Sequence, residues 1–349
     1  MTTTCRTIAW LALVLGPSAV ADEPAKQQPR SPEAQALADE VRDKGWIAYG
    51  ARTAQGDWDL FVCRPDGSDI RNITDTPTFS EAAPRFSPDG RRLLFRRLAR
   101  DAKINHDLWG FQGELMVARA DGSEAAAIGE DGEFPWASWS PDGKQISCLT
   151  KKGIRIVDLS DKKVVRELPR KGMYQQLLWS PDSKWFCGVT NNLGEMWTVA
   201  RMDAASGEMN AVNTFQNCTP DWCADAKRVI FSHRPKGQEG AGWTQLWLAD
   251  GDGGNRRLVY GEDGMHIYGG ATSPDDKYVL FTTSPGDGGG SEKDGAPMRL
   301  VRLADTPMIT GKSERLRKLH PDTRSGPVLD LPVGWEPHWT FTDIPRAGK

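Results

Sequence analysis

Short apolar runs separated by turn residues recur from about residue 45 to the end of the chain. Trp46 to Tyr49 and Trp185 to Gly188 are examples, and clusters of Pro, Asp, Ser and Gly separate such runs. This pattern is typical of short β-strands joined by tight turns. One earlier segment differs, because Ser31-Pro32 precedes an Ala- and Leu-rich stretch that ends near Arg42. Ser at the N-cap and Pro at the first helical position predict one short helix, packed loosely outside the main body.

The most regular of the turns is an aromatic residue followed by Ser-Pro-Asp-Gly. Pro presets φ at the second turn position, Asp hydrogen-bonds to its own backbone, and Gly accepts the left-handed conformation. Each copy lies between two apolar runs, so each predicts a β-hairpin. Three clear copies and two degenerate ones span Phe86 to Gly90, Trp139 to Gly143, Trp179 to Ser183, Trp222 to Ala226 and Thr272 to Asp276.

The spacing of these anchors indicates a repeat. Their second residues are Ser87, Ser140, Ser180, Cys223 and Ser273, which lie 53, 40, 43 and 50 residues apart. A second hairpin follows each anchor, so the unit has four strands and the length of a propeller blade. A truncated sixth anchor at Pro337 to Thr340 supplies one inner strand, and the unpaired strands at Trp46 to Tyr49 and Asp59 to Val62 supply others. The sequence therefore predicts an all-β, six-bladed propeller over residues 45–349, closed by both chain ends.

The repeated anchor, the apolar strand after it and the Asp-Gly turn of the next hairpin resemble the TolB-like family of β-propellers, over about residues 45–349. This resemblance implies the propeller fold. It leaves the function open, since repeats of this family serve as protein-binding scaffolds, carbohydrate-active enzymes and accessory domains of peptidases. No Gly-x-Ser-x-Gly motif occurs in the sequence, which excludes a complete propeller peptidase.

The first 21 residues have the pattern of a secretory signal. Arg6 precedes an apolar run from Ile8 to Leu15, and the small-residue triplet Ala19-Val20-Ala21 follows. The run is too short to span a bilayer, so we expect cleavage after Ala21 and no membrane span in the mature chain. Residues 22–44 are then a linker that contains the short helix, and the protein is predicted to be periplasmic or secreted.

The composition and charge of the chain limit the kinds of molecule that it could bind. Hydrophobic residues make up 38% of the chain, enough for a substantial core, while 44 Lys and Arg against 47 Asp and Glu give a net charge of -3. A near-neutral chain without a basic tract argues against nucleic-acid binding.

The mature chain would keep five cysteines. We expect at least three to be buried free thiols, and the sequence leaves open a bridge between Cys218 and Cys223. The five are Cys63, Cys148, Cys187, Cys218 and Cys223.

Blade topology predicts which loops share a face. The Ser-Pro-Asp-Gly turns should lie on one face, and the long connections, including Arg97 to Gly113 and His233 to Trp243, on the other. Long loops on a rigid scaffold commonly carry binding sites. All five histidines, including His320, map to the second face. Histidine is also common in polar loops that have no functional role. The candidate binding residues are His106, His233, Arg234, Trp243, His266 and His338.

A second resemblance concerns enzyme chemistry. Phe231-Ser232-His233-Arg234, then Trp243 to Trp247, then Gly264-Met265-His266 are similar to a segment of oligogalacturonate-lyase-like propellers. In that family channel-face histidines hold a divalent metal, and a basic residue removes a proton beside a uronate carboxylate. The resemblance implies Mn or Ca at His233, His266 and His338, with Arg234 pairing the carboxylate. Two points argue against a lyase of this family. The sequence predicts six blades whereas that family has seven, and the set of metal ligands is incomplete.

Two functional hypotheses follow. The first is a non-catalytic scaffold without a cofactor that recognises an envelope or secreted protein, or a polysaccharide, through the loop-rich face. The alternative is a metal-dependent lyase of the oligogalacturonate type that uses the channel-face histidines.

Overall fold

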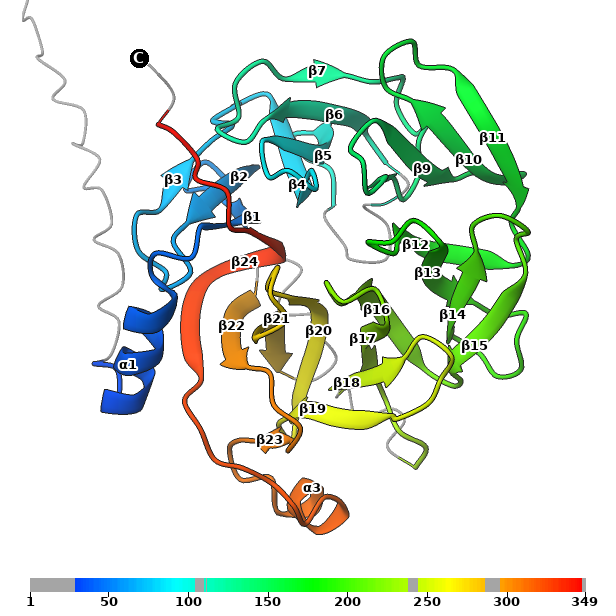
Figure 1. The fold of residues 1–349 in the computed structure, drawn as a ribbon. Coiled ribbons are helices and arrows are strands. Elements are labelled where there is room, and N and C mark those ends of the chain that lie inside the picture. The colour runs from blue at the N-terminus through cyan, green and yellow to red at the C-terminus, as the bar shows by residue number, and fades with distance from the viewer. Residues whose placement is uncertain (1–28, 104–109, 111, 238–243, 286–295, 347–349) are drawn as a thin grey trace, which may run out of the picture.

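The computed structural model describes residues 29–103, 110, 112–237, 244–285 and 296–346. In these ranges the helices and strands are almost all β-strands, and the sheets that they form are arranged radially around a central axis (Figure 1). Two short helices occur there, α1 (Pro32–Val41) and α3 (Glu314–Leu319). The prediction of an all-β propeller is therefore confirmed. None of the helices described is long and apolar enough to cross a membrane.

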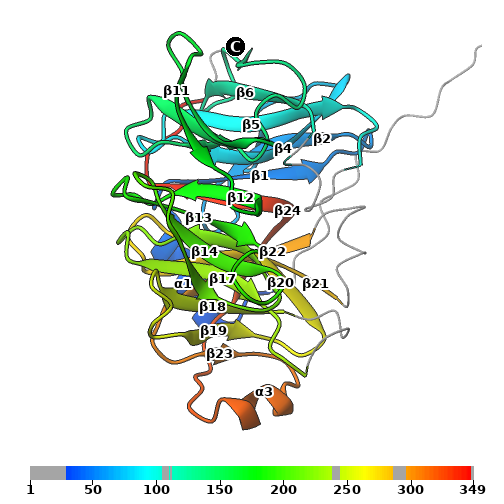
Figure 2. The same ribbon diagram turned by 90° about the vertical axis from the view of Figure 1, so that its right-hand side faces the viewer.

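Four sheets are separate blades, each with its first strand nearest the axis. The first contains β4 (Phe79–Phe86), β5 (Arg92–Ala99), β6 (Glu114–Arg119) and β7 (Ala126–Ala127), and the second β8 (Ser138–Trp139), β9 (Gln145–Leu149), β10 (Gly153–Asp158) and β11 (Val164–Pro169). The third contains β12 (Met173–Trp179), β13 (Trp185–Thr190), β14 (Thr198–Asp203) and β15 (Met209–Asn213). The fourth contains β16 (Asn217–Trp222), β17 (Arg228–His233), β18 (Gln245–Asp250), β19 (Arg257–Gly261) and β23 (Met308–Ile309), and α3 lies beside β23 at the periphery (Figure 2).

The fifth sheet has seven strands, where the sequence predicts two separate blades. Its order is β20 (Met265–Thr272), β21 (Tyr278–Pro285), β22 (Ala296–Arg302), β24 (Leu329–Thr340), β1 (Trp46–Arg52), β2 (Trp58–Cys63) and β3 (Arg71–Asn72). The sheet is continuous because β24 has two partners. Its first half pairs with β22, as in Ala296 with Gly334, and its second half with β1, as in Ile47 with Trp339.

The Ser-Pro-Asp turns form as their sequence predicts. The Ser87 hydroxyl donates to Asp89 at 2.5 Å and accepts from the backbone N–H of Arg92 at 3.0 Å, which fixes both ends of the turn. The same pair of bonds recurs in the other turns of this type. The indole of the aromatic anchor links neighbouring blades, since Trp139 Nε1 donates to the carbonyl of Arg85 at 3.0 Å.

A second repeat was not anticipated. In each of six segments leading to an anchor, the residue three positions before the aromatic residue or its equivalent has a left-handed backbone. These residues are Ala83 (φ 56°), Trp136 (49°), Gln176 (49°), Thr219 (48°), Gly269 (62°) and Glu336 (50°). Strand pairing shifts register around five of them, which marks β-bulges. A bulge re-aims the side chains that follow it.

Helix α1 forms where the sequence predicts it, with the Ser31 hydroxyl accepting from the Ala34 N–H at 3.2 Å and Pro32 in the first turn. The expected loose packing is wrong. Leu37 and Val41 are fully buried in one hydrophobic cluster with residues of β22 and β24. The ribbon of α1 lies beside β24 (Figure 1). The apolar positions recur on one face of the helix, so this face joins a hydrophobic core rather than contacting solvent.

The five cysteines in the described part of the chain are free thiols, so the structure does not contain the bridge between Cys218 and Cys223. Four of them are buried and Cys218 is half-buried.

Candidate functional site

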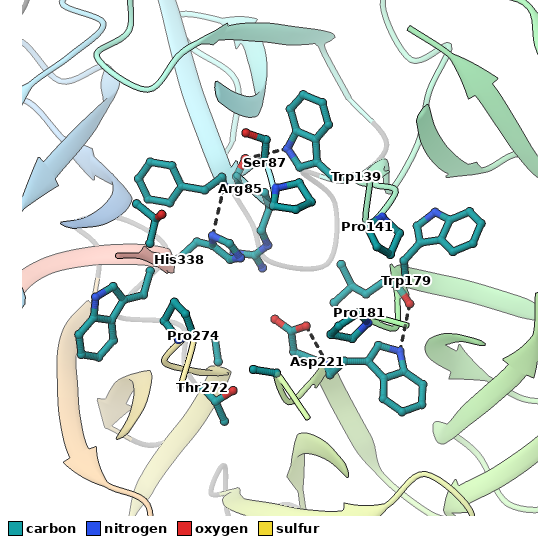
Figure 3. Close-up of a pocket in the computed structure, with 18 of the residues that line it drawn as sticks. Arg85, Ser87, Trp139, Pro141, Trp179, Pro181, Asp221, Thr272, Pro274 and His338 are labelled. Carbon is teal, nitrogen blue, oxygen red and sulfur yellow. Dashed lines mark hydrogen bonds between the residues drawn. The ribbon is translucent and has the colours of Figure 1, made fainter. Parts of the chain in front are cut away.

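A cavity of about 430 Å³ lies where the innermost strands end at the Ser-Pro-Asp turns (Figure 3). The residue immediately before each aromatic anchor, or its equivalent, contributes to the wall. These six residues are Arg85, Ser138, Leu178, Asp221, Ala271 and His338. They follow the six left-handed positions by two residues, so the bulges determine which side chains face the cavity. Prolines of the adjacent turns complete the rim: Pro88, Pro141, Pro181 and Pro274.

The tryptophans of the cavity serve mainly as supports between blades. Trp139, Trp222 and Trp339 are 7%, 6% and 4% exposed, and each indole N–H donates to a backbone carbonyl. Trp179 is half-buried and packs on Phe186 with ring centroids 4.2 Å apart. Since the faces of the first three rings are covered, they offer little surface on which a sugar ring could stack.

Arg85 forms an ion pair with Glu336 inside the channel. Its Nη2 donates to Glu336 Oε2 at 2.8 Å and its Nη1 to the Glu336 carbonyl at 3.2 Å. Glu336 is only 3% exposed, so this ion pair is shielded from solvent. A buried carboxylate and guanidinium neutralise each other, and the pair adds no net charge to the cavity.

His338 is a neutral hydrogen-bonding group. Its Nδ1 accepts from the backbone N–H of Phe86 at 3.1 Å, which leaves the proton on Nε2. Burial and the nearby Arg85 cation lower the pKa of His338 to about 3. The ring therefore stays uncharged through the physiological range.

Asp221 contributes the unpaired charge of the cavity. One carboxylate oxygen accepts from the Trp222 N–H at 2.8 Å. Burial raises the pKa of Asp221 to about 6; Arg85 and the Trp222 N–H oppose the rise, and Glu336 adds to it. Above that pH, Asp221 adds a negative charge to the cavity beside the ion pair of Arg85 and Glu336.

The structure separates the histidines that the sequence placed on one face. His338 lies among the Ser-Pro turns at the cavity, away from the long connections. His266 is 6% exposed, with its Nδ1 3.4 Å from Thr244 Oγ1 and its ring against Tyr268. His233 packs edge-on against Trp247, which also contacts His320, and burial lowers the pKa of His233 to about 4.

The remaining candidates do not complete a metal site. Arg234 donates to Gln216 Oε1 at 3.4 Å, and His106 and Trp243 lie outside the described residues. Within the described ranges, no group of three or more His, Cys, Asp or Glu side chains has an arrangement that could hold a metal ion. His233, His266 and His338 have different surroundings, which do not fit the ligand set implied by the lyase resemblance.

Arg85, Asp221 and Glu336 were missed by the sequence analysis. A usable signal existed, because a residue followed by Pro occupies the left-handed position in three of the six segments: Ala83-Pro84, Thr219-Pro220 and Glu336-Pro337. The residue after each of these prolines is Arg85, Asp221 or His338, the three polar side chains that point into the opening in Figure 3.

A second titratable cluster lies away from the cavity, between β2 and β4. Asp59 is 2% exposed and Glu81 is 1% exposed, and the Asp59 charge acts on the Glu81 carboxyl group. Asn72 donates to an Asp59 oxygen at 2.5 Å, and Thr76 donates to Glu81. Burial, and then the Asp59 charge, raise the pKa of Glu81 to about 7. Glu81 therefore keeps its proton up to about neutral pH.

The fold is a β-propeller with a cavity at one end of its central channel. Among solved structures, this fold is similar to that of TolB. No family model matches the chain. No curated protein matches its sequence. The structure is similar to TolB from Acinetobacter baumannii, at 17% identity and a TM-score of 0.54 over 85% of this chain and 67% of that one. It is also similar to the putative TolB from Agrobacterium tumefaciens, at 18% identity and a TM-score of 0.50 over 82% of this chain and 98% of that one.

A weaker similarity concerns oligogalacturonate lyase from Vibrio parahaemolyticus. The identity is 14% and the TM-score is 0.42, over 75% of this chain and 70% of that one. The predicted resemblance to TolB-like propellers is confirmed for the fold. At these identities the similarity concerns the fold alone.

Proposed function

We propose that this chain is a non-catalytic binding protein that holds a segment of another protein in the cavity at the channel mouth. The observation that carries the proposal is the cavity itself. Its wall is apolar at Leu178, Ala271 and the turn prolines, and a few polar groups converge on it. Ligand sites generally combine an apolar wall with a small number of placed polar groups.

A protein segment fits this wall better than a polysaccharide. Sugar-binding sites use exposed aromatic faces, whereas Trp139, Trp222 and Trp339 are buried between blades. The exposed aromatic surface is at the rim, where Phe341 is 41% exposed. The turn prolines and Leu178 provide surface for apolar side chains and extended backbone. The binding face in this proposal is thus the turn face rather than the loop-rich face.

We further propose that the seven-stranded sheet acts as two blades, which makes the propeller six-bladed and closed by both chain ends. Six left-handed positions, one before each anchor or its equivalent, support this count. The antiparallel pairing of β1 with the second half of β24 supports the closure. A closed ring leaves no long sheet edge open for unwanted pairing.

Periplasmic or secreted location is part of the proposal. It rests on the predicted signal at residues 1–21, with residues 22–44 as a linker to the propeller. Envelope and secreted proteins are then the partners to search for.

Site-specific photo-crosslinking in the producing cells tests the proposal. A photoreactive phenylalanine analogue at Phe341 lies at the cavity rim, and the same analogue at the exposed Leu319 on α3 is the control. We expect a discrete crosslinked protein from position 341, abolished by Leu178→Trp, which fills the cavity, and retained with Leu319→Trp. Equal products from both positions, or no effect of Leu178→Trp, would overturn it. Mn or Ca binding together with uronate cleavage would support the lyase hypothesis instead.

A further inference from the structure

The cavity contains one acidic group, Asp221, that forms no ion pair with a described residue, although the nearby Arg85 cation opposes the rise in its pKa. The guanidinium of Arg85 is held by Glu336 through its side chain and its carbonyl. Asp221 accepts one hydrogen bond, from the N–H of Trp222 at 2.8 Å. Among the residues that the structure describes, no Lys, Arg or His forms an ion pair with Asp221. An ionised carboxylate in such a position is stabilised by a cation that arrives from outside.

The geometry around Asp221 admits a cation from the open side. Asp221 is half-buried and points into the cavity, as Figure 3 shows, and Leu178 also lines this cavity. His338 offers an N–H on the same cavity and carries no positive charge that would repel a cation. Ala271 and Pro274 provide apolar wall for the methylene groups of a long side chain. The cavity thus combines an apolar wall with the Asp221 carboxylate, which a cation can reach from the open side.

We propose that Asp221 selects a Lys or Arg side chain of the bound segment, which inserts into the channel mouth and pairs with the carboxylate. This inference rests on the proposed function and names the chemistry that the site recognises. A charged hydrogen bond in a partly dehydrated site contributes enough to change affinity by about ten- to a hundredfold.

The pairing depends on pH in a defined direction. Burial raises the pKa of Asp221 to about 6, so the carboxylate is neutralised below that pH and attraction for the cation is lost. The charged and titratable groups near it are Arg85 from β4, Glu336 and His338 from β24, Cys187 from β13 and Cys223 after β16. Burial raises the pKa of both thiols, so they stay neutral near pH 6. His338 remains neutral down to about pH 3, so its titration does not interfere near pH 6.

A titration with small probes tests the selection on the whole protein. The probes are N-acetyl-lysine N-methylamide and its norleucine counterpart, which lacks the ammonium group. Indole N–H signals in ¹⁵N NMR report binding, because Trp139, Trp179 and Trp222 line the cavity. We expect saturable shifts at millimolar lysine probe at pH 7.5 and at least tenfold weaker binding of the norleucine probe. Binding of the lysine probe should weaken below pH 6.

Variants separate Asp221 from other acidic groups. Asp221→Asn should abolish the preference for lysine and the pH dependence, and it keeps an acceptor for the Trp222 N–H, so the fold is retained. Asp305→Asn, at a fully exposed side chain that contacts Arg257, is the matched control and should bind the probe normally.

The inference is overturned if the lysine probe produces no shift, if norleucine binds equally, or if Asp221→Asn keeps the preference. In each of these cases, a crosslink from Phe341 that Leu178→Trp abolishes would show that the cavity binds a segment without selecting a cation. If Leu178→Trp did not abolish the crosslink from Phe341, the proposed function itself would be wrong.

Discussion

Replacing Glu81 by Gln should stabilise the protein at alkaline pH. In the native fold Glu81 is buried beside Asp59 and its pKa is raised to about 7, whereas its ordinary value is 4.5. Between these values the folded chain keeps a proton that the unfolded chain has released. Folding stability therefore decreases as pH rises through this window.

The magnitude follows from the two pKa values. A difference of one in pKa corresponds to about 1.4 kcal/mol, so the interval from 4.5 to about 7 corresponds to about 3 kcal/mol of stability lost by pH 8. Glu81→Gln keeps the side chain neutral at every pH. Its amide N–H can donate to Asp59, and its oxygen can accept from Thr76 as the carboxyl does.

Urea denaturation of both proteins from pH 4.5 to 8.5 measures the effect. The variant and the wild-type protein should be of similar stability near pH 4.5, and the variant should exceed the wild type by about 3 kcal/mol at pH 8. Taking the difference between the two proteins removes the contribution of other titrating groups. Glu208→Gln, at an exposed side chain, should leave the profile unchanged. A variant that is less stable at pH 8, or that has the wild-type pH slope, would refute the explanation that Glu81 keeps its proton in the folded protein.

Two further predictions concern the closure and the helix. Deleting residues 337–349 removes the part of β24 that pairs with the start of β1 and exposes both strand edges, so we expect aggregation or the loss of a cooperative thermal transition; a wild-type melting curve would contradict the closure. Leu37→Ala on α1 should lower the free energy of unfolding by about 2–5 kcal/mol, because the side chain is fully buried, whereas the exposed Leu319→Ala on α3 should change it by less than about 0.5 kcal/mol. A change at Leu37 as small as the control would mean that α1 does not belong to the cooperative core.

The turns could be predicted from sequence because their conformation is encoded locally. Ser87 and Asp89 are two residues apart and form the turn with their own side chains and backbone. The bulges could not be predicted in this way. The left-handed positions are occupied by residues as different as Trp136, Gln176 and Glu336, none of which favours positive φ. Packing of the innermost strands around the axis imposes this conformation against local preference.

The location of His338 illustrates the same limit. The sequence places His338, in the truncated sixth anchor, on the face of the long connections. The strand that contains it in fact begins at Leu329, so His338 lies close to its end, at the turn face. The length of β24 depends on its pairing with β22, and that contact is distant in sequence. Charge complementarity in the channel, such as Arg85 with Glu336, depends on the same long-range arrangement.

The pairing of β1 with β24 also determines how the protein responds to mechanical force. Trp46, at the start of β1, lies opposite Thr340, at the end of β24, so the two chain ends leave the sheet at the same point. Tension applied through both ends would separate the strands one hydrogen bond at a time instead of shearing all of them together. A molecule tethered at both termini would therefore lose the packing of α1 and then this seam first, at low force, while the four separate blades stayed folded.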